Sequence, residues 1–111
     1  MIILGVFRLI YFWRDSGLEY VIVFSDTSAA ILAERCLTGA GVPVSVMPLP
    51  ESIGAGCGIT LRVGAELRQS ALGALADNGV RVLAVYSRER TDTGYLYEKI
   101  GDFYGAVAIN S

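Results

Sequence analysis

The amino-acid sequence predicts one α+β domain, with two helices packed on one face of a four-stranded antiparallel sheet. Three observations lead to this prediction. The chain has 111 residues, which suits a single domain, and 53% of them are hydrophobic, which is ample for a core. Apolar runs typical of strands alternate with two stretches of helical periodicity. Glycine and proline punctuate the chain between these segments, where turns are expected.

The first strand and the first helix follow each other directly. Residues 20–24 are β-branched or aromatic, which is typical of a buried strand. Ser25, Asp26 and Thr27 then offer side-chain oxygens that can accept hydrogen bonds from the free amides of a helix N-terminus. Apolar residues recur at helical spacing over 29–40, and the glycines near its end are expected to stop the helix.

The next part of the chain predicts two strands, a helix and a final strand. The strands are expected at 42–47 and 58–63, the helix at 65–77 and the last strand at 80–87. Proline cannot donate to a strand ladder, so Pro43 places its strand at an edge of the sheet or stands at the strand's first residue. The resulting order is that of a ferredoxin-like βαββαβ sandwich, for which we expect the sheet order 4-1-3-2.

Both faces of the first strand are apolar, although the two helices cover only one face of the predicted sheet. Tyr20, Ile22 and Phe24 alternate with Val21 and Val23. A second layer must therefore cover the other face. The candidates are the N-terminal segment, the C-terminal tail and another subunit, so a homo-oligomer formed through the open sheet face is one expectation.

We expect the domain itself to occupy 18–87, with an extension at each end. Residues 1–17 form an apolar extension that is shorter than the roughly 20 apolar residues of a membrane-spanning helix. This extension is a structural segment, a targeting segment or the product of a start codon assigned too far upstream. Residues 88–111 are expected to be a linker and a helical tail, because apolar residues there fall at helical spacing: Leu96, Ile100, Phe103, Tyr104 and Val107.

Composition excludes several classes of function. The chain has no histidine, so it cannot form a Ser-His-Asp triad or a Cys-His dyad. Its two cysteines are too few for a zinc site and lack the spacing of a disulfide framework, and we expect neither metal nor cofactor. Free thiols favour a reducing, cytoplasmic location. With a net charge of −2 and no basic stripe along the sequence, we expect no nucleic acid and no membrane as partner.

The residue with the greatest chemical promise is Cys57, which lies between Gly56 and Gly58. Small neighbours leave a thiol accessible and let a partner approach the backbone. In the predicted topology this loop lies at the same end of the sheet as Ser25, Asp26 and Thr27, where a helix N-terminus stabilises a thiolate and the carboxylate of Asp26 opposes one. Alternatively, the loop is only a tight turn. Cys36 lies on the apolar side of the first helix and is expected to be a core residue.

Four stretches of the sequence resemble one known family. They are residues 23–27, the Ala33-Glu34 pair, residues 41–44, and residues 57–62, which begin with Cys-Gly. Together they are similar to the putative selenium/sulfur carrier-like domains of bacteria and archaea, over about residues 19–87. The resemblance implies that Cys57 is the residue that carries sulfur or selenium.

Two functions follow as hypotheses. In the first, Cys57 holds a persulfide or perselenide that a donor protein supplies and an acceptor protein takes away. This chemistry needs a nucleophilic thiolate but no second catalytic residue, so the protein would be a carrier rather than an enzyme. In the alternative, the chain is a non-catalytic ferredoxin-like module for ligand sensing or oligomerisation.

Overall fold

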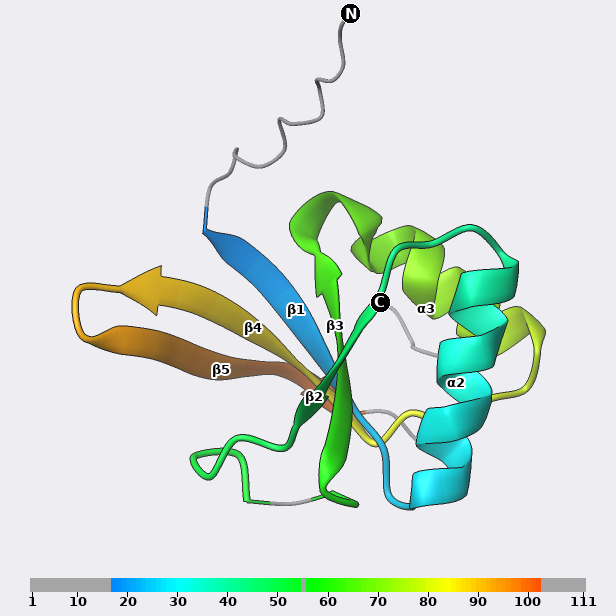
Figure 1. The fold of residues 1–111 in the computed structure, drawn as a ribbon, viewed down its shortest axis with the longest axis horizontal. Coiled ribbons are helices and arrows are strands. Elements are labelled where there is room, and N and C mark those ends of the chain that lie inside the picture. Colours follow the sequence, from blue (N-terminus) through cyan, green and yellow to red (C-terminus); the bar gives the residue numbers. More distant parts are fainter. Residues whose placement is uncertain (1–16, 55, 103–111) are drawn as a thin grey trace, which may run out of the picture.

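The computed structural model describes residues 17–54 and 56–102, which form one sheet and two helices (Figure 1). In chain order the elements are β1 (Leu18–Val23), α2 (Thr27–Gly39), β2 (Ser45–Pro48), β3 (Ile59–Gly64), a 3-10 turn (Ala65–Leu67), α3 (Arg68–Asp77), β4 (Ala84–Thr91) and β5 (Gly94–Asp102). The α+β class expected from the sequence is therefore found.

The sheet is antiparallel throughout and its strands run in the order β2-β3-β1-β4-β5. β1 lies between β3 and β4, and β2 forms an edge, as the proline-containing segment before it indicated. The prediction of a four-stranded sheet is wrong, because β5 adds a fifth strand beside β4.

The added strand corrects the interpretation of residues 88–111. Residues 88–91 are not a linker but the second half of β4, and 94–102 are not a helix but β5. The two strands form a hairpin that turns at Asp92 and Thr93 and extends away from the rest of the sheet (Figure 1). Phe103, Tyr104 and Val107, which completed the helical pattern, lie outside the described residues.

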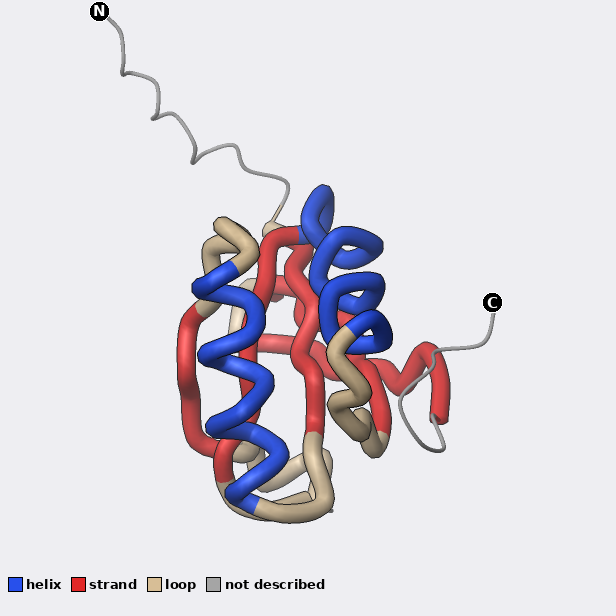
Figure 2. The backbone as a smooth tube through the Cα atoms, turned by 90° about the vertical axis from the view of Figure 1, so that its right-hand side faces the viewer, coloured by secondary structure: helices blue, strands red, loops and turns tan. Residues whose placement is uncertain are grey.

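Both helices pack on the same face of the sheet (Figure 2). α2 buries Ala30, Ala33 and Leu37, and α3 buries Ala71 and Leu75. These side chains meet the buried residues that the strands present to the helices: Ile22, Phe24, Leu61, Val63 and Val85. Among the described residues, no helix is long and apolar enough to cross a membrane.

Both helices end in the same way, and this explains why two strands begin later than expected. Gly41 and Gly79 have φ values of 79° and 69°, and each is followed by a valine. The Val42 amide donates back to the Leu37 carbonyl at 2.9 Å, and the equivalent bond joins the residues after α3 to its last turn. These are Schellman caps, in which the valine amide donates to the last turn of the helix. The same amide is then not available to pair with a neighbouring strand. β2 therefore begins at Ser45 and not at Val42.

The second face of the sheet is covered in part by the loop that joins β2 to β3. Val21 and Val23 point away from the helices, yet neither is exposed. The Gly56 backbone lies directly against Val23, and the Leu49 side chain lies beside the same glycine. The loop thus turns toward the face that the helices leave open (Figure 1). From the sequence, the candidates to cover this face were the N-terminal segment, the C-terminal tail and another subunit. An internal loop was not among them.

Candidate functional site

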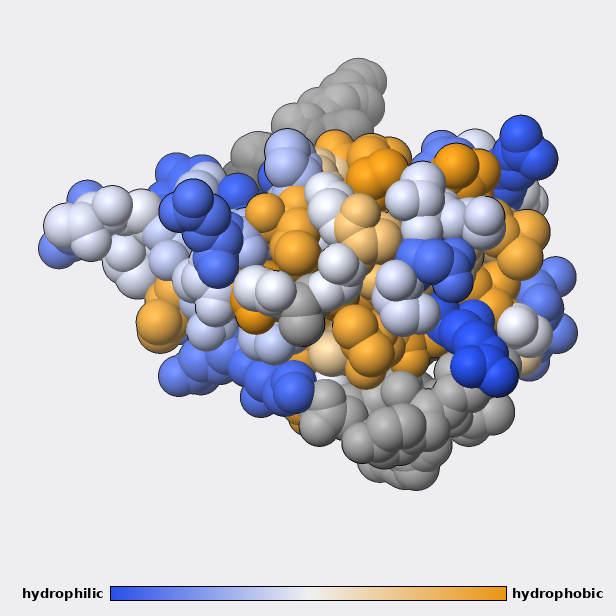
Figure 3. Space-filling model, turned by 90° about the horizontal axis from the view of Figure 1, so that it is seen from below, coloured by the Kyte–Doolittle hydropathy of each residue, from blue (hydrophilic) through white to orange (hydrophobic). Residues whose placement is uncertain are grey.

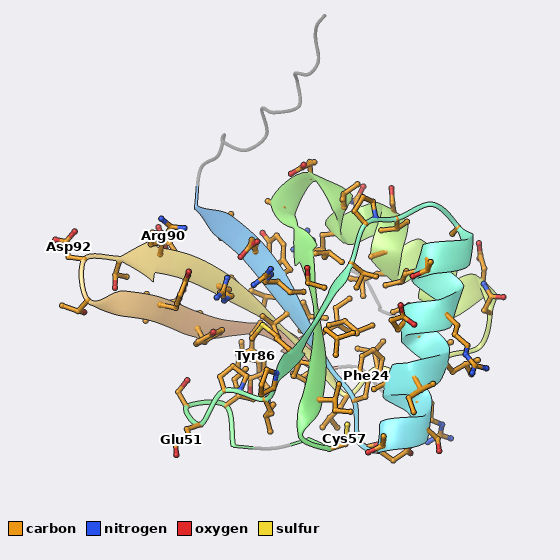
Figure 4. All side chains as sticks on the ribbon, in the orientation of Figure 1. Phe24, Glu51, Cys57, Tyr86, Arg90 and Asp92 are labelled. Atoms are coloured by element: carbon orange, nitrogen blue, oxygen red, sulfur yellow. The ribbon has the colours of Figure 1, made fainter. Side chains whose placement is uncertain are left out.

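Cys57 lies near the end of the loop between β2 and β3, and backbone hydrogen bonds hold it against β1. The Cys57 amide donates to the Phe24 carbonyl at 3.0 Å, just after β1 ends. The Leu49 amide donates to the Gly58 carbonyl at 2.9 Å and closes the base of the loop. Figure 4 shows Cys57 at the lower end of the sheet, beside Phe24. The position of the cysteine is thus fixed in large part by main-chain hydrogen bonds.

The two flanking glycines have backbone conformations that other residues rarely adopt. Gly56 has a φ of 136° and Gly58 a φ of 96°. A Cβ on Gly56 would lie 2.7 Å from Cγ1 of Val23 and 3.3 Å from the Phe24 carbonyl oxygen, whereas a Cβ on Gly58 would meet open space. Gly56 therefore allows the loop to approach β1, and both glycines allow the turn at Cys57. Their predicted role in supporting the loop fits this geometry.

The Cys57 thiol is half-buried. Its Sγ donates to the Ile59 carbonyl at 3.4 Å and packs against the edge of the core. Both neighbouring glycines are exposed, so the thiol is shielded on the core side and lies under small residues on the solvent side.

The three residues predicted to surround the thiolate lie at the same end of the sheet. Ser25 directly follows Phe24, whose carbonyl binds the Cys57 amide, and all three side chains are exposed. Asp26 caps α2, since its Oδ1 accepts from the Ala29 amide at 2.8 Å. The carboxylate is therefore directed to the helix amides. The influence of Ser25, Asp26 and Thr27 on the thiol stays a prediction.

The cap gives a testable consequence for stability. We expect Asp26→Ala to lower the free energy of unfolding by about 1 kcal/mol, because the substitution leaves the Ala29 amide without its acceptor. Asp26→Asn keeps an acceptor oxygen and should lose much less. Urea unfolding of the two variants checks this, and equal losses would show that charge and not capping is at work.

Cys36 differs from Cys57 in its surroundings. It lies on α2, and its Sγ donates to the Ala74 carbonyl of α3 at 3.4 Å. It packs against the core, as expected, but it is half-buried and not buried. Cys36 thus joins α2 to α3 as a packing residue with one weak hydrogen bond.

Sequence reasoning did not find Phe24 as part of this site. Its side chain is fully buried, and its carbonyl orients the cysteine. A backbone contact between distant segments leaves no pattern in residue types, so no sequence signal could reveal it. Within residues 17–54 and 56–102, no group of three or more potential metal ligands comes together.

The surface at this end of the molecule is mixed in character. Viewed from below, it carries hydrophobic patches interspersed with polar residues (Figure 3). Leu49, Ile53 and Leu83 are half-buried residues of the loops there, and the Leu83 amide binds the Val23 carbonyl at 2.8 Å. This end of the molecule therefore combines a half-buried cysteine with partly apolar loops, and the chain has no imidazole for acid–base catalysis.

The fold and this site define a small α+β domain that presents a single glycine-flanked cysteine at one end of its sheet. The chain belongs to the family described as putative Se/S carrier protein-like, which matches residues 19–87. The matched region runs from the second residue of β1 into the middle of β4 and includes Cys57. Comparison with curated proteins and with solved structures gave no match.

Proposed function

We propose that this protein carries reduced sulfur or selenium, held on Cys57 as a persulfide or a perselenide. The observation that carries the proposal is the position of Cys57 inside the family match, in a loop where two glycines flank the half-buried cysteine. The family description supplies the class of cargo. The loop supplies a fixed, approachable sulfur.

The transfer needs only the thiolate of Cys57 and a partner that holds the cargo. The Cys57 thiolate attacks the outer sulfur of a donor persulfide, a new S–S bond forms, and the S–S bond of the donor breaks. The donor leaves as a thiolate, and the proton of its outer sulfur stays with the transferred atom. No net oxidation or reduction occurs, so no further reagent is required. An acceptor thiolate can remove the atom by the same step.

This proposal places the catalysis in the partners. A donor protein generates the persulfide or perselenide, and an acceptor protein consumes it, while Cys57 holds it in between. A half-buried thiol suits such a role, because the Ile59 carbonyl and the core edge shield one side of the sulfur from other reagents. A reducing cytoplasm would keep the carrier free of disulfides.

Mass spectrometry tests the proposal. We expect incubation with a cysteine desulfurase and cysteine to add about 32 Da, the mass of one sulfur atom, to Cys57. Cys57→Ser should lose the adduct, whereas Cys36→Ser, which removes the other thiol, should keep it. No adduct despite turnover of the donor, or an adduct confined to Cys36, would overturn the proposal and favour a sensing or oligomerisation module.

A further inference from the structure

The sheet gathers basic and aromatic residues on the face away from the helices. Cross-strand partners point to the same side of a sheet. The observed register therefore places three rows on this side: Arg62, Val21, Tyr86 and Lys99; then Glu19, Arg88 and Tyr97; then Arg90 and Tyr95. We call the polar and aromatic members of these rows the Arg–Tyr face.

Direct contacts show that these side chains meet. The Arg88 guanidinium pairs with Glu19, its Nε donates to the Tyr97 hydroxyl at 3.1 Å, and it lies 3.6 Å from the centre of the Tyr95 ring. Partial burial lowers the pKa of Arg88, but the hydrogen bonds to Tyr97 and Glu19 outweigh this and raise it. Arg62 also pairs with Glu19, at 3.4 Å. Arg88 therefore stays charged and holds the tyrosines in place.

The charge of this face is opposite to that of the whole chain. The chain carries −2 overall. The three rows nevertheless hold four of its nine Lys and Arg residues, namely Arg62, Arg88, Arg90 and Lys99, against the single acid Glu19. Two acids of the hairpin, Glu89 and Glu98, alternate with these residues and fall on the other side. Within these three rows, strand alternation thus leaves an excess of positive charge.

The tyrosines give this basic face a second property. Tyr95 is 44% exposed even though Arg88 covers one side of its ring. Tyr86 and Tyr97 are half-buried on the adjacent rows. By register, Tyr86, Tyr97 and Tyr95 share this face of β4 and β5, and we call these three rings the aromatic platform. Sheet faces that carry aromatic rings bind the unstacked bases of single strands, and nearby cations bind their phosphates.

We propose that the Arg–Tyr face binds single-stranded nucleic acid. Bases stack on Tyr95 and its neighbouring tyrosines, and Arg90 and the field of the other cations attract the phosphates. An acidic protein would satisfy the charge but would leave the aromatic platform unused. The sequence shows no basic stripe and therefore predicted no nucleic-acid partner. These cations come together only in the folded sheet, because they lie at alternate positions on three separate strands.

This binding is separate from the proposed carrier function. Glu19 and Arg88 lie at the opposite end of β1 from Phe24 and Cys57. A nucleic-acid complex and a persulfide on Cys57 are therefore detected by different measurements, and either can fail alone.

Fluorescence anisotropy of the whole protein with labelled oligouridine RNA and oligothymidine DNA of about 12 nucleotides tests the proposal. We expect saturable binding to at least one of them, weakening as salt is raised. RNA alone, DNA alone or both would each support the proposal and identify the source. Arg90→Ala should reduce the salt slope by about one, whereas Arg35→Ala, a matched loss of charge on α2, should not.

A second pair of variants tests the stacking. Tyr95→Ala should weaken binding about fivefold or more, and Tyr95→Phe should keep most of it. No binding at low salt would overturn the proposal. So would equal effects of Arg90→Ala and Arg35→Ala, or equal binding of a duplex or of polyglutamate, since these would show attraction to charge alone.

Discussion

Replacement of Phe24 by alanine is expected to lower the free energy of unfolding by about 3–5 kcal/mol. The Phe24 side chain is fully buried in the core cluster, which includes residues of both helices. Its removal leaves a cavity that rigid neighbours fill only in part. A domain of this size is typically stable by about 5–15 kcal/mol, so the variant should be largely unfolded at moderate urea concentrations. Circular dichroism during urea unfolding measures the loss.

The same variant should also affect the site. It keeps the backbone carbonyl that binds the Cys57 amide, but the cavity left by the ring loosens the segment to which Cys57 is bound. Alkylation of Cys57 should therefore be faster in Phe24→Ala under native conditions. Ile31→Ala serves as the control: Ile31 is 48% exposed on α2, and its truncation should change stability by less than about 0.5 kcal/mol. If the two variants were equally stable, Phe24 would not be the core residue described above.

Gly56→Ala is expected to be the most damaging change in the cysteine loop, with a loss of about 2–4 kcal/mol. Two costs add. The φ of 136° is unfavourable for alanine, and the new Cβ would lie 2.7 Å from Cγ1 of Val23. Val23 is fully buried, and the Phe24 carbonyl, 3.3 Å from the new Cβ, belongs to the backbone, so neither can move away easily. The loop must then lift from β1, and Cys57 moves with it.

Two other glycines separate these costs. Gly58→Ala meets only the unfavourable φ of 96° in open space, so it should lose about 1–2 kcal/mol. Gly73→Ala, in the middle of α3 with nothing within 4 Å, should instead gain up to about 1 kcal/mol, because alanine favours the helix. Urea unfolding of the three variants gives their order. A Gly56→Ala protein as stable as Gly58→Ala would show that the contact with Val23 is unimportant.

The helices and inner strands were predictable because local patterns specify them. The helical spacing over 29–40 and the capping oxygen of Asp26 lie within one segment of chain, and both appear in α2. The starts of two strands were predicted less well, because the amides of Val42 and of the valine after α3 bind the helix ends instead of a strand. Such a bond depends on how each helix ends, which apolar character alone does not reveal.

The hairpin was missed for a physical reason. β4 continues past the end of its pairing with β1, so the far part of the hairpin does not pack against the core. Its residues are therefore free to be charged, and the polar sequence from Ser87 to Gly94 looks like a linker. Leu96 and Ile100 then suggest a helix by their spacing, although they belong to β5. The signal that was available is the turn at Asp92, between two stretches of alternating residues.

The site was likewise predictable only in part. The up-and-down order of strands predicted that the cysteine loop and the start of α2 share one end of the sheet, and the bond from Cys57 to Phe24 agrees with this. The close approach of Gly56 to Val23 was not predictable, since it depends on the path of a whole loop. Arg62, on the strand after Cys57, pairs with Glu19 on β1, a contact between separate strands that no local pattern predicts.

The central place of β1 in the sheet has a consequence for how the chain assembles. β1 pairs with β3 on one side and with β4 on the other, where Leu18 meets Glu89 and Val23 meets Ala84. During synthesis, the second of these partners emerges only after both helices are complete. Until then the innermost strand of the finished protein has an open edge, which is the condition under which nascent chains pair wrongly or aggregate. Contacts between such distant segments also form slowly, so we expect the pairing of β4 with β1 to be the slow step of folding.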